Sequence, residues 1–347
     1  MSLSKGYGVL KCRAIAGKKE FNDNSPHYQV HVSDGRFDYR LAINVKSIQK
    51  PYDLLYFIDN NFKHYITDKL EQLDFGFTRI QDKNGGIALD YIRGNLFNIK
   101  KMRPLPYDLP GENNDLNELI DVYIQRAIAS KASIYAFGEP WGIEPPENQP
   151  DKIFGFQPNR GVHNIHMNQG SRGKFAQDNG VYQDGGLLIH YPSTAPFSDI
   201  WVAAFFAFQS QSFHTDDRTG NPIDKRVGFE PPQVGVPVMK APVRIIAALI
   251  NPFGDDTAQK ESVTLINSSP ENIDLTNWKI VNQLQQKYRL ERLKLEPGGV
   301  VKVTFNKDFQ LSNQGGTISL LNSENIKVDG VSYTKEDIKQ QGWTIVF

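Results

Sequence analysis

Residues 151–217 carry the side chains that are best suited to chemistry. Four of the seven histidines lie there, at positions 163, 166, 190 and 214, among amides, carboxylates and long apolar residues. Imidazoles exchange protons near neutral pH, and polar groups set into an apolar scaffold are typical of a ligand-binding or active site. The stretch therefore predicts a functional site without fixing its reaction.

The motif GVHNIHMNQG gives the first half of a hydrolase hypothesis. In it, His163 or His166 acts as general base or nucleophile on a phosphodiester or similar ester. Asn168 and Gln169 cannot exchange protons, but their amides can donate hydrogen bonds to a developing oxyanion. A strand would send the two histidines to opposite faces, whereas a helix or a bulge would bring them together. Both alternatives stay open.

A second acid–base group and an orienting carboxylate complete this hypothesis. His27 or His214 would supply the acid–base group, and Asp184 or Asp216 would hold a histidine as the carboxylate of a catalytic triad does. The chain has no GxSxG motif, so a serine at a nucleophile elbow is not supported.

Three further residues are expected to bind the substrate. Gln209 and Gln211 follow the apolar run IWVAAFFAF, which predicts a strand buried on both faces that delivers polar groups at its rim. Arg93 begins a basic segment that could neutralise a phosphate or carboxylate. A solvated basic loop also explains that segment.

The sequence leaves the cofactor and the activity undecided. A His-x-x-His pair with no nearby cysteine or acidic residue fits no standard zinc signature, so no metal or cofactor is assigned. Convergence of Asp216 or Asp217 with these histidines would favour metal-assisted hydrolysis. The competing hypothesis is a non-catalytic ligand-binding or adaptor protein, in which the polar cluster ties loops together through hydrogen bonds.

Alternation in HYQVHV predicts a strand with His27, Gln29 and His31 on one face. Four residues along a strand span about 13 Å, so the two imidazoles cannot share a metal ion. A polar outer face of an antiparallel sheet also explains this pattern. Residues 33–35 predict a hairpin that leads to a second strand, YRLAINV.

An apolar stripe predicts a helix over residues 115–131, capped by Asn114 or Asp115 and packed against the sheet. Pro51 predicts a short helix over 51–62, and residues 67–74 predict another. Gly17 and the two lysines after it predict a turn that ends the first strand. Further strands are expected at ASIYAFG and GVHNIHM.

Composition is that of a globular protein, with 39% hydrophobic and 22% charged residues among 347. Basic and acidic residues both number 39, so no global field attracts nucleic acid or an anionic membrane. Cys12 is the single cysteine, which excludes an intramolecular disulfide. The longest apolar run near the middle, about nine residues, is too short to span a bilayer. The N-terminus lacks a signal-peptide pattern, so we expect a cytoplasmic protein, with leaderless secretion left open.

Two domains are expected, over residues 1–250 and 258–347. The first should be an α+β domain, mainly antiparallel sheet with a few helices. After residue 258, short strands recur every 8 to 12 residues between turn signals, which predicts an all-β immunoglobulin-like sandwich.

The C-terminal strands resemble the lamin tail domain. The resemblance rests on a strand ending in Asn, a Leu and Trp after a turn, a Pro-Gly-Gly corner, a Leu-Leu-Asn strand and an Asp before a tyrosine. These are residues 265–267, Leu275 with Trp278, residues 297–299, residues 320–322, and Asp329 with Tyr333. The resemblance implies an appended interaction module for a protein, a glycan or a nucleic acid.

The first 250 residues resemble the bacterial YukJ-like family of unknown function. The segments that carry this resemblance include PHYQVHV, LDYIRGNLF, YAFGEPWG, GVHNIHMNQG, QDGGLLIHYP and FQSQSFHTDDRTG. The resemblance implies no reaction, so the expected substrate stays an unidentified small molecule or polymer.

Overall fold

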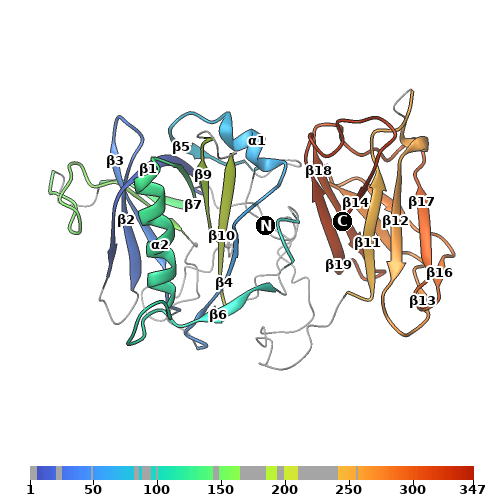
Figure 1. Cartoon of the computed structure of the whole chain (residues 1–347), viewed down its shortest axis with the longest axis horizontal. Helices are drawn as coiled ribbons and strands as arrows, with labels where there is room; N and C mark the ends of the chain where they lie inside the picture. The colour runs from blue at the N-terminus through green and yellow to red at the C-terminus, as the bar shows by residue number, and fades with distance from the viewer. Residues whose placement is uncertain are drawn as a thin grey trace.

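The structure of the chain is a computed structural model. It describes residues 6–20, 26–47, 50–81, 86–87, 95–98, 101–143, 148–164, 185–193, 199–209, 241–254 and 257–347. The strands form two bodies that lie side by side (Figure 1). The N-terminal body is built on a ten-stranded sheet, and the C-terminal body is a sandwich.

The N-terminal body contains two helices, α1 (Ile66–Glu71) and α2 (Leu116–Ala129). Its strands are β1 (Gly8–Lys19), β2 (His27–Ser33), β3 (Asp38–Asn44), β4 (Leu54–Asp59), β5 (Gly76–Arg79), β6 (Arg103–Leu105), β7 (Ser133–Trp141), β8 (Gly161–Asn164), β9 (Gly185–Tyr191) and β10 (Ile200–Phe208). They are ordered β5-β1-β2-β3-β8-β7-β9-β10-β4-β6 in the sheet. Neighbouring strands are antiparallel except β3 and β8, which run parallel.

The long strand β1 closes part of this sheet on itself. Its first half pairs with β5 and β7, and its second half pairs with β2. Strands β1, β2, β3, β8 and β7 therefore form a ring of hydrogen-bonded neighbours. The body is mostly β and barrel-like, which corrects the expected α+β class, although the few helices and the mainly antiparallel pairing are as expected. Closure depends on pairing residues 8–12 with residues 134–138, and local sequence patterns do not report such distant pairs.

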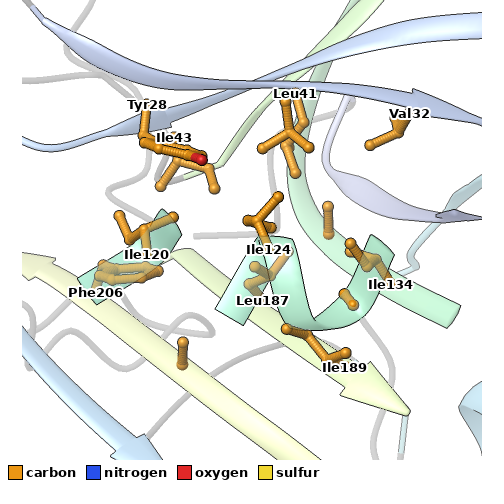
Figure 2. Packing of buried hydrophobic residues seen from close by; sticks show 14 of the residues in the cluster. Tyr28, Val32, Leu41, Ile43, Ile120, Ile124, Ile134, Leu187, Ile189 and Phe206 are labelled. Atoms are coloured by element: carbon orange, nitrogen blue, oxygen red, sulfur yellow. The ribbon is translucent and has the colours of Figure 1, made fainter. Parts of the chain in front are cut away.

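Helix α2 lies inside the curve of the sheet, within the main apolar core. Figure 2 shows Ile120 and Ile124 between residues of β2 and β3 on one side and residues of β9 and β10 on the other. The helix begins after Asp115, whose carboxylate accepts a hydrogen bond from the Glu118 N–H at 2.8 Å. The expected helix and its cap are thus confirmed.

A second core covers the opposite face of the sheet. Helix α1 contributes Ile66 and Leu70, which pack with aromatic residues of β7 and β10. Strand β10 is buried along nearly its whole length on both faces, as its unbroken apolar run predicts.

Two local expectations are wrong. Residues 54–59 form strand β4 and not a helix, because they pair with β10 and the sheet overrides the proline signal. Gly17 lies within β1 and not in a turn. A Cβ at Gly17 would lie 2.1 Å from the Tyr28 hydroxyl, so a side chain there would displace the tyrosine, which bonds to Asp121.

The C-terminal body is a sandwich of two four-stranded sheets and a two-stranded ribbon. Its elements are β11 (Val243–Leu249), η3 (Ala258–Lys260), β12 (Ser262–Asn267), β13 (Ile273–Asp274), β14 (Lys279–Asn282), β15 (Lys287–Arg289), β16 (Lys294–Leu295), β17 (Val300–Thr304), β18 (Gly316–Leu321), β19 (Lys327–Tyr333) and β20 (Thr344–Val346). One sheet is ordered β17-β12-β11-β20 and the other β15-β14-β18-β19. Strand β11 thus belongs to the sandwich.

Asn267 explains one part of the C-terminal sequence pattern. Its buried amide donates to the carbonyl oxygens of Glu271, Leu295 and Glu296. The backbone of Asn267 also bonds to Gly298 and Gly299 of the Pro-Gly-Gly corner. The asparagine therefore fixes the end of β12 against the turn that leads to β17.

Asn95 joins the two bodies. Its amide donates to the carbonyl oxygens of Ile318 at 2.9 Å and Val331 at 3.2 Å, both on the β18–β19 sheet. Its carbonyl oxygen accepts from Ser319 at 3.1 Å and from Lys327.

Within the described part of the chain, no helix is long and apolar enough to cross a membrane.

Candidate functional site: two imidazoles outside the barrel

His27 and His163 meet on the face of the sheet that points away from α2. His27 lies on β2 and His163 on β8, and β3 runs between these strands. Ala42 of β3 pairs with His163, and its methyl group leaves room above the sheet for larger neighbours. The ring centroids of the two histidines are 5.4 Å apart, with a 48° angle between the rings. Two of the imidazoles expected from the sequence are therefore adjacent.

Glu20 holds the first of these imidazoles. Its Oε2 lies 3.4 Å from Nδ1 of His27 and accepts a hydrogen bond from the Gln29 amide at 2.7 Å. The interaction with His27 outweighs the effect of burial and lowers the pKa of Glu20 to about 2. The Nε2 atom of His27 is buried and has no hydrogen-bond partner among the described residues. A carboxylate on one nitrogen and an unengaged second nitrogen meet two of the requirements of a general base.

Aromatic and charged side chains pack beside His163. The Trp141 ring lies 4.6 Å from the His163 ring, and the Arg40 guanidinium stacks 5.1 Å from the Trp141 ring centre. Arg40 is buried and donates from Nε to Asp151 at 2.7 Å. Asp151 also accepts from the N–H groups of Ile153 and Phe154. This network fixes the loop over 148–160 against the sheet and fixes Trp141 beside His163.

His31, the next imidazole along β2, has different surroundings. Its ring stacks on Phe154 and Phe156, with centroids 5.5 and 4.9 Å away. Its Nε2 lies 3.3 Å from Asp38. Its described ring contacts are to these phenylalanines and not to another imidazole, which makes His31 a useful comparison for His27.

Of the other expected site residues, Gln209 is the one that the structure describes. It is buried at the end of β10, where its amide donates to the Asp53 carbonyl oxygen at 2.8 Å. Strand β10 is three strands away from β8, so Gln209 is not brought to the imidazole pair. The remaining expected residues lie outside the described residues: Arg93, His166, Asn168, Gln169, Asp184, Gln211, His214 and Asp216. Their roles stay predictions.

Glu20, Trp141 and Arg40 were missed by sequence reasoning. Glu20 follows two lysines in a segment that resembles a turn, but β1 continues to Lys19 and the Glu20 N–H bonds to the His27 carbonyl oxygen. The alternation of β2 predicted the polar face correctly. The register that places Glu20 and His163 on that face could not be obtained from spacing alone.

Comparison with known proteins gives matches in both bodies of the structure. Residues 239–335 match the Lamin Tail Domain, which covers most of the sandwich. Over 220 residues the chain is 44% identical to Uncharacterized protein YukJ of Bacillus subtilis (strain 168). This match covers 62% of the present chain and 93% of the Bacillus protein. Residues 1–220 match the family described as Uncharacterized conserved protein (DUF2278). The chain therefore belongs to this family and carries a lamin tail domain after the family region.

Proposed function

We propose that the chain is a hydrolase of phosphodiesters or similar esters, with His27 and His163 as its acid–base pair. The contact between these two imidazoles, one of them held by Glu20, is the observation that carries the proposal. Two histidines in opposite protonation states can supply both proton transfers that ester hydrolysis needs.

The geometry suggests a role for each ring. With Nδ1 directed at Glu20, neutral His27 keeps its proton on Nδ1 and a lone pair on Nε2. Nε2 would take a proton from a water molecule as its oxygen bonds to phosphorus or to the ester carbonyl carbon. His163 would give a proton to the leaving oxygen as the ester bond breaks. Glu20 would stabilise the imidazolium formed on His27.

The first test is a screen of the full chain against bis(p-nitrophenyl) phosphate, p-nitrophenyl phosphate and p-nitrophenyl acetate. We expect phosphodiester turnover, and we expect His27→Gln to lower kcat/KM by about 10²–10⁴-fold because it removes the general base. Far-UV circular dichroism checks that the variant is folded. Equal rates for wild type and His27→Gln on every substrate would contradict the proposal.

The buried Arg40–Asp151 pair favours a second candidate, a non-catalytic adaptor. In that case the polar residues around Trp141 serve to hold the loop over 148–160, and the sandwich recruits a protein, glycan or nucleic acid. This candidate predicts that His27→Gln lowers thermal stability and that the wild-type chain turns over none of the substrates. Detectable wild-type turnover that is lost in His27→Gln decides against it.

A further inference from the structure

His190 lies near the end of β9, on the same sheet face as the imidazole pair but far from it. On β7, Ser133 pairs with His190 and Glu139 pairs with His163. Six residues of strand separate these two positions, a distance of about 20 Å. The surroundings of His190 are therefore a separate location from the proposed hydrolytic site.

Neighbouring rings fix the orientation of the His190 side chain. Its imidazole stacks on Trp201 with a centroid distance of 4.6 Å and a 9° interplanar angle. Trp201 in turn contacts Tyr135, whose ring is 5.1 Å away. This stack restrains the plane of the imidazole, and in that plane Nε2 lies toward Glu71 and Asp199.

Two carboxylates converge on that nitrogen. Glu71 at the end of α1 places Oε1 3.5 Å from His190 Nε2, and Asp199 just before β10 places Oδ2 3.2 Å from it. The other Asp199 oxygen accepts the Ser193 N–H at 2.6 Å, which leaves Oδ2 directed at the histidine. The three ligand atoms lie within 4.8 Å of one another.

These distances suit ligands that share a cation. Atoms that bind zinc tetrahedrally at about 2.0–2.1 Å are separated by roughly 3.3 Å. A charge-assisted hydrogen bond between imidazolium and carboxylate is shorter, about 2.7–2.9 Å. The buried Nε2 makes no hydrogen bond of normal geometry to any described residue. The convergence of one imidazole and two carboxylates, and not any single distance, is what distinguishes this cluster from the one-carboxylate contacts of His27 and His31.

We propose that Glu71, His190 and Asp199 bind a divalent transition-metal ion of the zinc or manganese class. Imidazole nitrogen with carboxylate oxygen suits these ions, whereas magnesium and calcium prefer oxygen alone. The His190 side chain is 15% exposed, but Glu71 and Asp199 are 45% and 54% exposed, so one side of the ion faces solvent. A three-ligand site with an open side keeps a position for water or a substrate.

Space for such a ligand lies next to Asp199. Asp199 and Trp201 line a cavity of about 570 Å³ between the two bodies, whose other wall includes Asn313 and Lys335 of the sandwich. A molecule in this cavity would contact the lamin tail domain and Asp199 together. Asp199 is thus shared by the proposed ion site and the wall of this cavity.

Calorimetric titration of the chelator-treated full chain with ZnCl₂ and MnCl₂ tests the proposal. We expect one ion per chain, a rise in Tm with the ion, and a change in tryptophan fluorescence because Trp201 stacks on His190. Asp199→Asn and His190→Gln should each weaken binding at least about tenfold. His31→Gln is the matched control, since His31 lies 3.3 Å from a single carboxylate, and it should bind as wild type does.

Asp199 is more than half exposed, so Asp199→Asn should fold even where His190→Gln does not. Absence of stoichiometric binding to the wild-type chain, or equal affinities for wild type and Asp199→Asn, would overturn the proposal. The hydrolase assays are run with chelator present, so failure of either proposal does not decide the other.

Discussion

Glu20 shows how one side chain can set the chemistry of its neighbour. Its carboxylate faces His27 and accepts from Gln29, and its pKa falls to about 2, mainly through His27. Since the pKa is depressed in the folded chain, the carboxylate stabilises the fold above its unfolded pKa of about 4.5. That contribution is lost as the pH falls from about 4.5 to about 2.

We therefore predict that Glu20→Gln destabilises the chain at pH 6–7 by on the order of 1–2 kcal/mol, allowing for solvent screening. The difference from wild type should shrink between pH 4.5 and pH 2. Urea unfolding across this pH range measures the free energy of unfolding of wild type and variant. Glu112→Gln is the control, because Glu112 lies at an exposed loop position. A difference that stays constant with pH would show that the ionised Glu20 side chain gains no stability from His27 and Gln29.

At the scale of elements, the segments with strong local patterns were predicted and those set by distant partners were not. The helix at 116–129, strands β2 and β3 and the buried strand β10 follow from periodicity and capping. Strand β4 does not, because Pro51 gives a helix signal and the pairing with β10 decides the outcome. The turn predicted at Gly17 was wrong for a related reason. The glycine is needed inside β1 because a side chain there would collide with Tyr28 on the next strand.

Helix α2 should be a main source of stability for the N-terminal body. Ile124 is fully buried in the core between the two halves of the sheet, whereas Val122 on the same helix is 54% exposed. We predict that Ile124→Ala costs about 2–5 kcal/mol in the free energy of unfolding because it leaves a cavity. Val122→Ala should change that free energy by less than about 0.5 kcal/mol. Denaturant titration compares the two, and similar costs would contradict this placement of the helix.

At the scale of the molecule, the sequence predicted two bodies and the sandwich, but neither barrel closure nor the junction. Closure depends on β1 meeting β7, and the junction on Asn95 reaching β18 and β19. The same limit applies to the candidate site, where the polar face of β2 was predictable but the approach of His163 and Glu20 required the three-dimensional register.

Asn95 allows a direct test of the junction. The residue has a φ of 46°, and the hydrogen bonds to the sandwich residues named above are made by its side chain. Asn95→Gly therefore keeps the backbone unstrained and removes those bonds. We predict a loss of about 1–3 kcal/mol, seen in calorimetry as a lower or split transition. Asn113→Gly is the matched control, with a φ of 58° at an exposed position. Identical melting of the two variants would argue against a junction held by Asn95.

The central claim is that His27 and His163 act together. The most direct test is kcat/KM for bis(p-nitrophenyl) phosphate in His163→Gln, in the double variant His27→Gln/His163→Gln and in His31→Gln. We predict that the single variant at His163 and the double variant lose similar activity, about 10²–10⁴-fold, because the two rings act as a unit. His31→Gln should keep the wild-type rate. Wild-type activity in His163→Gln, or an equal loss in His31→Gln, would contradict the account.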